Sequence, residues 1–270
     1  MRFVHISDTH IAADPSYAQY GHAPLPNLEA LVTAINALTF PVDFVLHTGD
    51  LAADGSEKAY QLARRVLARP RFPIYYVAGN HDDSDILQRS MLDRAPRGPR
   101  LDYGIVVNGV QVAIFDSRGP DDPGGTLTDE QVAALRSLCV PSGPPLLIAI
   151  HHPPLPLDSP WLDDGWVTPK GRTASMLLDR GPEFVDAIYP ARNRIAGVFF
   201  GHVHRAYQIM HRGILFSSAP SSFGPFLTWP DQDAPKAAPA EQAGFSLVTI
   251  TGEQTTIRYH AVVRPVSMPQ

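Results

Sequence analysis

The chain has 270 residues, of which 44% are hydrophobic and 18% are charged. This composition excludes a disordered protein and supplies a core for one large α/β domain or two small ones. A formal net charge of −5 argues against general nucleic-acid binding, and the single cysteine, Cys139, excludes an internal disulfide framework and a four-thiolate zinc site.

Hydropathy and the first residues bear on the compartment. No run approaches the ~20 apolar residues of a membrane span. The N-terminal sequence MRFVHISDTH passes directly into a strand-like run, which leaves no room for a signal peptide. We therefore expect a soluble protein of the cytoplasm.

Short apolar runs alternate along the chain with amphipathic stretches, which is typical of βα units. Five of the runs are rich in Val, Ile, Leu and Phe and do not alternate with polar residues, as expected for strands covered on both faces. The predicted strands are Phe3–Ser7, Asp43–Thr48, Ile74–Ala78, Leu146–Ile150 and Gly197–Phe200.

Three stretches between these strands predict helices. The first has apolar residues at helical spacing from Leu28 to Leu38, after the start signal Pro26-Asn27. The second runs to Leu67 and is capped by Ser56. The third, Thr128–Leu138, opens with a capping box, in which Gln131 follows Thr128 by three residues.

Two hairpins raise the strand content above that of a single doubly wound sheet. Asn108-Gly109 suits a type I′ turn within Val106–Val110. Near the C-terminus, Phe245–Ile250 and Thr255–Tyr259 form the second pair. The pattern predicts an α/β fold with a mixed two-sheet core and outer helices.

Two long irregular segments interrupt one expected domain spanning residues 1–270. Residues 153–171 follow a histidine pair and are expected to form a wall near the active site; Trp161 and Trp166 in this loop either stack on a base or anchor the loop by packing. Residues 219–244 are an irregular insertion, for which a flexible role and a functional role are equally consistent with the sequence.

Each of the five predicted strands ends in a polar cluster. If the strands are largely parallel, these clusters emerge along one sheet edge, where open α/β sheets bind ligands. Any one cluster occurs often by chance, but five in succession indicate a site. The clusters are Asp8-Thr9-His10, Gly49-Asp50, Gly79-Asn80-His81-Asp82, His151-His152 and Gly201-His202-Val203-His204.

The residue types in these clusters predict a metal centre. Imidazole and carboxylate ligands suit Mn, Fe, Co, Ni or Zn. Seven ligands are too many for one such ion and suit two ions with open positions, and Asp50 in a Gly-Asp turn is the natural bridge. Two divalent ions with Asp8 and Asp50 leave a formal charge of +2, or +1 with a bridging hydroxide, and such a site attracts phosphate and activates water.

The ordered motifs resemble those of the calcineurin-like metallophosphoesterase superfamily. The similarity is greatest to its class III cyclic nucleotide phosphodiesterase and bacterial glycerophosphodiesterase branch. It extends over about residues 3 to 204, and it is weaker beyond them. The shared stretches are HISDTH from His5, Tyr20-Gly21, TGDLA from Thr48, GNHDD from Gly79, HHPPLP from His151 and GHVH from Gly201.

The resemblance implies a fold and a role for each motif residue. The fold is an α/β/β/α sandwich. One metal ion is held by Asp8, His10 and His204, and the other by Asn80, His151 and His202. Asp50 bridges the ions, and His81 binds the phosphate or protonates the leaving oxygen. The cofactors implied are two divalent ions of Mn, Fe, Zn or Co, and the family also implies a homo-oligomer.

Two neighbouring branches fit less well. Purple acid phosphatases have a tyrosine ligand three residues after the bridging aspartate, where this chain has Ala53. Serine/threonine protein phosphatases have the motifs GDxVDRG and GNHE, whereas this chain has GDLAADG and GNHDD at the corresponding positions.

The expected activity is therefore hydrolysis of small phosphodiesters by attack of a metal-bridging hydroxide. The first substrate class is 3′,5′-cyclic nucleotides, and glycerophosphodiesters are the alternative. A nuclease and a non-catalytic scaffold are weaker alternatives, because the chain is acidic and all seven ligand positions are filled. The arginines at 89, 94, 97 and 100 are expected to be solvated rather than to bind nucleic acid.

The remaining histidines near the motifs are expected to support the site rather than to bind metal. The side chain of His152 should point away from that of His151 on an extended segment. His5 and His47 lie within or at the end of strands and are expected to be hydrogen-bonded core residues.

Overall fold

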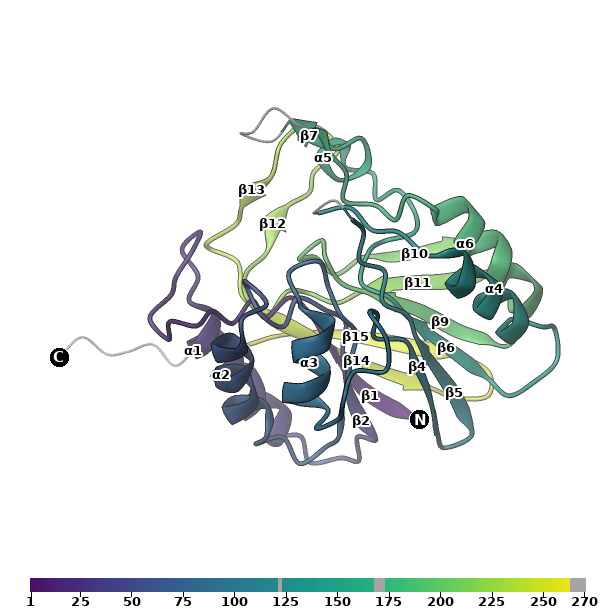
Figure 1. Ribbon diagram of the computed structural model, residues 1–270, viewed down its shortest axis with the longest axis horizontal. Helices are drawn as coiled ribbons and strands as arrows, with labels where there is room; N and C mark the ends of the chain where they lie inside the picture. The colour runs from purple at the N-terminus through teal and green to yellow at the C-terminus, as the bar shows by residue number, and fades with distance from the viewer. Residues whose placement is uncertain (121–122, 168–172, 263–270) are drawn as a thin grey trace.

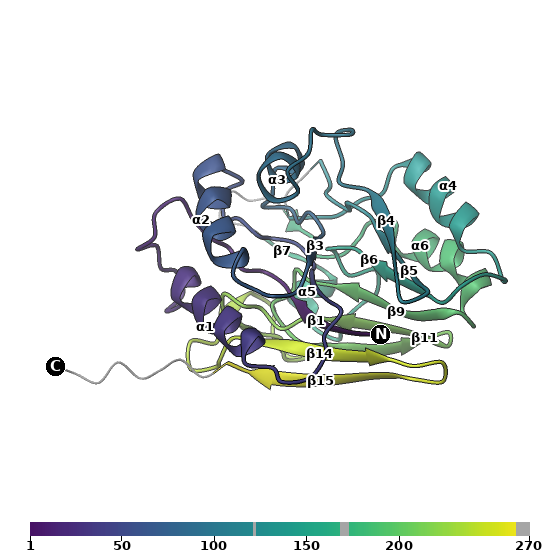
Figure 2. The same cartoon turned by 90° about the horizontal axis from the view of Figure 1, so that it is seen from below.

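The computed structural model describes residues 1–120, 123–167 and 173–262. Two large β-sheets lie face to face between two groups of helices (Figures 1 and 2). Within the described ranges, no helix is both long enough and apolar enough to span a membrane.

The first sheet has the strand order β15-β14-β1-β2-β3. Its three N-terminal strands are parallel, and the C-terminal hairpin joins them antiparallel to β1. The strands are β1 (Arg2–Ile6), β2 (Phe44–His47), β3 (Ile74–Tyr76), β14 (Gly244–Ile250) and β15 (Thr255–Ala261).

The second sheet has the order β10-β11-β9-β6-β5-β4. Its four central strands are parallel and its two edge strands are antiparallel to their neighbours. The strands are β4 (Tyr103–Val107), β5 (Val110–Ile114), β6 (Leu146–Ala149), β9 (Ile195–Phe200), β10 (Gln208–His211) and β11 (Ile214–Ser218).

Three buried apolar clusters correspond to the three interfaces of a four-layer sandwich. One lies between the sheets and contains Phe3, Phe44 and Phe199. A second joins the first sheet to α1 (Pro24–Asn36), α2 (Glu57–Leu67) and α3 (Ser84–Met91), and the third joins the second sheet to α4 (Asp129–Leu138) and α6 (Gly181–Ile188). These layers confirm the expected α/β/β/α sandwich (Figure 2).

Local sequence signals explain several element boundaries. The Thr128 side chain accepts a hydrogen bond from the backbone of Gln131, whose side chain accepts one from the backbone of Thr128, so the capping box is confirmed. Ser56 caps α2, also as predicted. Asn108 and Gly109 have φ values of 49° and 79°, as a type I′ turn requires. The sequence reading missed α3 and α6, which have only eight residues each.

The two long segments contain short elements. Residues 153–167 include α5 (Pro160–Asp163) and β7 (Trp166–Val167), which pairs with β8 (Thr173–Ala174); residues 168–171 of the predicted wall lie outside the described residues. The 219–244 segment forms the two-stranded pair β12 (Phe226–Leu227) and β13 (Lys236–Ala237). In Figure 1 this pair arches away from the sheets toward α5 and β7. The short 3₁₀ helix η1 (Tyr189–Ala191) follows α6.

Candidate metal centre

The polar clusters after five strands meet where the carboxyl ends of the two sheets adjoin. β1, β2 and β3 lead into the clusters at Asp8, Asp50 and Asn80, whereas β6 and β9 lead into those at His151 and His202. The sequence pattern suggested one sheet edge; both sheets contribute. The seven predicted ligands are thereby brought together: Asp8, His10, Asp50, Asn80, His151, His202 and His204.

One group of donors surrounds His204. Its Nε2 atom lies 3.1 Å from Nε2 of His10 and 3.6 Å from Oδ1 of Asp8. All three residues are buried. These are the residues predicted to share the first ion.

A second group surrounds His151. Its Nε2 atom lies 3.1 Å from Oδ1 of Asn80 and 3.1 Å from Nδ1 of His202. These are the residues predicted to share the second ion.

Asp50 lies between the two groups. Its Oδ2 atom is 3.6 Å from Nε2 of His10 and 3.4 Å from Nε2 of His151. Its Oδ1 atom accepts a hydrogen bond of 3.0 Å from the backbone N–H of His81. The position matches that expected of a bridging carboxylate.

Backbone carbonyls orient two of the imidazoles. Nδ1 of His151 donates to the Thr48 carbonyl at 2.7 Å, and Nδ1 of His204 donates to the Gly224 carbonyl at 2.8 Å. In a neutral imidazole the other nitrogen then carries a lone pair. Both Nε2 lone pairs therefore face the centre, which is the arrangement that metal-binding histidines adopt.

The donor set fits divalent transition ions. With its Nδ1 proton donated outward, His204 presents a lone pair toward His10 over only 3.1 Å, beside the Asp8 and Asp50 carboxylates. In the other group, His151 faces the Asn80 amide oxygen and the Asp50 carboxylate. Neighbouring lone pairs repel unless a proton or a cation lies among them. Imidazole nitrogen with carboxylate oxygen suits Mn, Fe, Co or Zn.

Five of the seven predicted ligands have their backbone in the left-handed region. This region costs a residue other than glycine about 1–3 kcal/mol, and Asp and His are several times more common there than most residue types. Such strain is typical of binding sites that the surrounding fold holds in place. The ligands with positive φ are Asp8 (54°), His10 (45°), Asp50 (53°), His202 (72°) and His204 (54°).

Glycine allows the ligand loops to approach one another. Gly49 has φ of 105°, and a Cβ there would overlap Nδ1 of His151; a Cβ at Gly79 would overlap Oδ1 of Asp50. The Gly-Asp motif therefore needs glycine for space and for backbone conformation, and the Gly-Asn-His-Asp motif needs it for space.

Opposite charges are paired within the site. Burial opposes ionisation of Asp50, but His151 and His81 outweigh it and hold the pKa of Asp50 well below its usual value. Burial likewise opposes protonation of His151, yet Asp50 and Asp8 raise its pKa to about 9. An imidazolium–carboxylate pair thus occupies the middle of the centre when no cation is bound.

Burial shifts the pKa values of three further predicted ligands toward the neutral form. Burial lowers the pKa of His10 and of His202 well below the usual value, so both offer neutral nitrogen. Burial raises the pKa of Asp8 in spite of its histidine neighbours. A bound cation would favour the ionised form of Asp8.

His81 lies beside the centre and is exposed. Its ring centroid is 4.8 Å from that of His10, and its Nδ1 atom is 2.9 Å from the carbonyl oxygen of Ala53. When Nδ1–H is donated to that carbonyl, Nε2 is the atom available for proton exchange at the site.

The neighbouring histidines have supporting contacts. His152 lies near His151 and His202, but its Nδ1 is 2.9 Å from Ser117 Oγ and its Nε2 is 3.0 Å from the Pro123 carbonyl, so both ring nitrogens are engaged. His5 and His47 are fully buried and contact Thr48 and Thr9 at 2.9 and 3.1 Å.

A buried carboxylate, Asp82, joins two of the ligand loops. It accepts hydrogen bonds from the backbone N–H groups of Leu51, Ala52 and Gly79 and from the Tyr60 hydroxyl, at 2.9–3.2 Å. The first Asp of GNHDD, Asp82, therefore holds the Asp50 and Asn80 loops together.

Sequence reasoning missed the residues that support His204. Nδ2 of Asn27, on α1, donates to the Phe223 carbonyl at 2.6 Å, and the next residue supplies the carbonyl that orients His204. Ser221 fixes the same loop, because its hydroxyl donates to the Asp8 carbonyl and accepts from the N–H groups of Phe223 and Gly224 at 3.0 Å. The only sequence signal was a polar residue at a buried helix position.

The tryptophan and arginine hypotheses have different outcomes. Trp161 is buried, and its indole N–H donates to the Leu227 carbonyl at 3.2 Å, so it anchors the loop rather than facing a ligand. The side chain of Trp166 lies outside the described residues. Of the arginine run, Arg94 stacks over Tyr103, and Arg100 donates to the Asp116 carbonyl at 2.7 Å, so both fold back onto the protein.

Comparisons with known proteins agree with this geometry. The family model for calcineurin-like phosphoesterases matches residues 1–206. The 3′,5′-cyclic adenosine monophosphate phosphodiesterase CpdA of Pseudomonas aeruginosa is 31% identical over 222 residues, covering 81% of this chain and 75% of the relative. The glycerophosphodiester phosphodiesterase GpdQ of Enterobacter lignolyticus is 28% identical over 228 residues, covering 82% and 77%.

A solved structure shows the same fold. The dimetal phosphatase of Danio rerio superposes with a TM-score of 0.69 over 97% of this chain and 96% of its own, at 13% identity. Its low identity makes this a likeness of fold alone. The family match over residues 1–206 and the 31% identical relative establish that the chain belongs to the calcineurin-like phosphoesterase family.

Proposed function

We propose that the protein hydrolyses small phosphodiesters at a two-metal centre, with 3′,5′-cyclic nucleotides as the first substrate class. The observation that carries the proposal is the position of Asp50 Oδ2, within 3.4–3.6 Å of both His10 and His151, one from each donor group. A relative that covers most of this chain is named for cyclic AMP hydrolysis.

The proposed division of ligands follows the two groups of donors. Asp8, His10 and His204 would hold one ion, and Asn80, His151 and His202 the other, with Asp50 shared. Mn, Fe, Zn or Co are the proposed metals, on the chemistry of the donors. When bound, two such ions lower the pKa of water and neutralise charge on phosphoryl oxygens.

The chain's own residues position the reactants and move the proton. The carbonyls of Thr48 and Gly224 hold His151 and His204 in the tautomer that faces the centre. We assign His81 to the leaving group. The P–O ester bond breaks as water oxygen bonds to phosphorus, and Nε2 of protonated His81 gives its proton to the departing alkoxide. The water releases one proton to solvent, and solvent returns a proton to His81, so the step balances. The Ala53 carbonyl fixes the ring for that transfer.

Glycerophosphodiesters are the second candidate class, because a relative of similar coverage is named for them. A nuclease is disfavoured by the net charge of −5, and a scaffold by the complete set of seven donors. We also propose, from composition and family resemblance, that residues 1–270 form a single domain and that the protein is a homo-oligomer of the cytoplasm. Light scattering of the purified protein tests the oligomeric state.

The test is a substrate panel with Asp50→Ala as the matched inactive variant. Metal-loaded wild-type protein should hydrolyse bis(p-nitrophenyl) phosphate and cyclic AMP, and Asp50→Ala should lose both activities while keeping its far-UV circular dichroism. Turnover of glycerophosphocholine without turnover of cyclic AMP would assign the second class. No hydrolysis of any diester with Mn²⁺, Fe²⁺, Zn²⁺ or Co²⁺ would overturn the enzyme proposal.

A further inference from the structure

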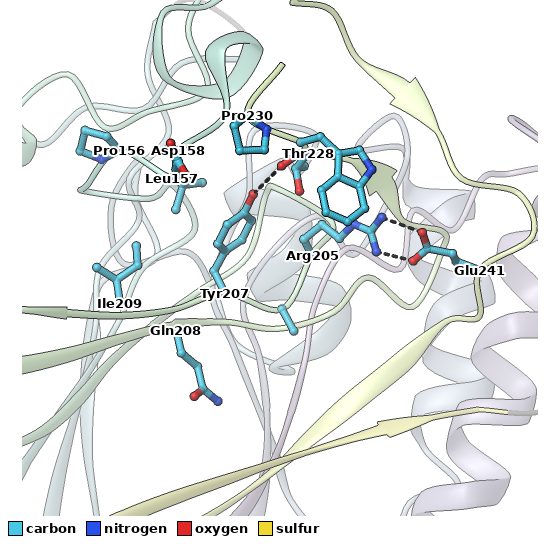
Figure 3. A pocket seen from close by; sticks show the side chains of 12 residues that line it. Pro156, Leu157, Asp158, Arg205, Tyr207, Gln208, Ile209, Thr228, Pro230 and Glu241 are labelled. Atoms are coloured by element: carbon cyan, nitrogen blue, oxygen red, sulfur yellow. Dashed lines mark hydrogen bonds and ion pairs between the residues drawn. The ribbon is translucent and has the colours of Figure 1, made fainter. Parts of the chain in front are cut away.

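A cavity of about 750 Å³ opens beside the predicted ligand His204. We call it the Trp229 pocket, and Figure 3 shows its lining side chains. The pocket has the size of a small-molecule site. The residues that define it are Pro156, Leu157, Asp158, Arg205, Tyr207 and Trp229.

Three walls of the pocket continue directly from the metal-centre segments. Residues 156–158 follow the His151-His152 pair, and Arg205 follows His204 in the chain. The third wall, residues 228–230, follows Phe226, whose ring centroid is 5.1 Å from that of His204. A substrate whose phosphate lies at the centre could therefore extend its other part into the pocket.

The walls are held together, so the pocket is formed without a ligand. The Arg205 guanidinium pairs with both carboxylate oxygens of Glu241, and its Nε–H donates to the Phe226 carbonyl. The Tyr207 hydroxyl contacts the Thr228 carbonyl at 3.5 Å. Figure 3 shows the Arg205–Glu241 pair and the contact between Tyr207 and Thr228.

The charge of the pocket excludes a second anionic group. Arg205 is the only cation among the lining residues, and Glu241 already pairs with it. Asp158 is exposed and adds a further negative charge. An additional phosphate would be repelled here, whereas an uncharged group would not.

The remaining surface suits a flat apolar group. Pro156 and Tyr207 offer apolar area, and the Trp229 side chain is 62% exposed. A ligand that covers an exposed tryptophan gains free energy by burying its apolar surface. Every nucleobase can supply that cover, because each has a flat face that stacks on an aromatic ring. Trp161, by contrast, is only 2% exposed and already packed.

We propose that the Trp229 pocket binds the nucleobase and sugar of the substrate, with Trp229 stacking on the base. This inference rests on the proposed function, since it assigns the part of a cyclic nucleotide that lies beyond the phosphate. The pocket also predicts a preference for a single nucleotide over an oligonucleotide, because an oligonucleotide would bring further phosphates toward Asp158.

The kinetic test compares Trp229→Ala, Trp229→Phe and the control Phe40→Ala in the metal-loaded protein. Phe40 is an exposed aromatic outside the pocket. We expect Trp229→Ala to raise KM for cyclic AMP about tenfold with metal content unchanged, from the loss of base stacking. Trp229→Phe should restore most of the affinity, and Phe40→Ala should leave KM unaltered. An unchanged KM in Trp229→Ala would overturn the proposal, as would an equal loss toward glycerophosphocholine.

A binding test separates this proposal from the proposed function. Adenosine has no phosphate, and it should quench tryptophan fluorescence in the wild type but not in Trp229→Phe. Hydrolysis of bis(p-nitrophenyl) phosphate without adenosine quenching would overturn the pocket assignment and leave the phosphodiesterase intact. Quenching through Trp229 without hydrolysis of any diester would support the pocket and overturn the enzyme.

Discussion

The Nε2 atoms of His10 and His204 lie 3.1 Å apart, although Nδ1 of His204 already gives its proton to the Gly224 carbonyl. Two imidazoles brought together in this way, with Asp8 and Asp50 beside them, form a cluster of donors that suits a cation. The fold creates this contact by placing the ends of β1 and β9, from different sheets, against each other.

Replacement of His81 tests its role in protonating the leaving group. His81→Ala should lower kcat for cyclic AMP by about 10²–10⁴-fold, since a ribose alkoxide needs a proton as it leaves. Bis(p-nitrophenyl) phosphate releases a stable phenolate, so kcat for this substrate should fall much less. Steady-state kinetics on both substrates give the comparison; equal losses would assign His81 to phosphate binding instead.

Proton release on metal binding tests the charge state of His151. Burial lowers the pKa of His151, but Asp50 and Asp8 outweigh this effect and raise the pKa to about 9. This imidazole is therefore protonated below pH 9 in the metal-free protein. A metal ligand must be neutral, so binding expels that proton. Calorimetric titration with Mn²⁺ at pH 7.5, in buffers of different ionisation enthalpy, counts the protons released on binding. His151→Gln should release about one proton fewer than the wild type.

The control for that experiment is His5→Gln. Burial lowers the pKa of His5 to about 3, so this residue has no proton to release at pH 7.5. Equal proton release from wild type and His151→Gln would contradict the ion pair with Asp50.

Acid should unfold the metal-free protein through His5 and His47. Burial lowers the pKa of each to about 3, whereas the unfolded value is about 6.5. The unfolded state therefore binds more protons between pH 6.5 and 3, and stability falls as the pH falls through this window. Each histidine contributes about 1.4 kcal/mol of unfolding free energy per pH unit.

Urea unfolding at pH 7, 5.5 and 4.5 measures this slope. His5→Gln should flatten it by the contribution of one proton, while His260→Gln, at an exposed position on β15, should not. A slope in His5→Gln equal to that of the wild type would show that His5 takes up its proton in the folded state.

Asn27 is expected to position His204 from a distance. Asn27→Ala removes the hydrogen bond to the Phe223 carbonyl and loosens the loop whose Gly224 carbonyl orients His204. Loss of such indirect support typically lowers metal affinity about 10–100-fold. Metal competition titrations should show this loss for one of the two ions only.

Asn36→Ala provides the matched control on the same helix. Nδ2 of Asn36 donates to the Arg69 carbonyl at 3.1 Å, away from the ligand loops. Asn36 Oδ1 also accepts a hydrogen bond from the Arg71 backbone N–H at 3.3 Å, so Asn36→Ala removes two side-chain bonds to backbone and Asn27→Ala removes one. Equal metal affinities of the two variants would show that Asn27 has a structural role only.

The sequence allowed the sandwich and the set of ligands to be predicted because their determinants are local. Asp8, Asp50, Asn80, His151 and His202 each follow a buried strand within a few residues, so strand prediction also placed the ligands. The capping box of α4 and the Asn108-Gly109 turn were equally local.

The supporting contacts depend on long-range packing and could not be predicted. Asn27 and Phe223 are 196 residues apart in the chain, and nothing near either residue specifies the other. Likewise, Trp161 and Trp229 both lie in long segments that are irregular by sequence pattern. Trp161 is nevertheless buried in α5 and Trp229 is exposed, because the packing of residues 219–244 decides which indole is covered.

The most direct test of the two-metal centre is metal analysis coupled to activity. Chelator-treated protein should contain no transition metal and should not hydrolyse bis(p-nitrophenyl) phosphate; titration with Mn²⁺ should restore activity as occupancy approaches two ions per chain. Full activity of the metal-free protein, or occupancy by two ions without hydrolysis, would contradict the proposal.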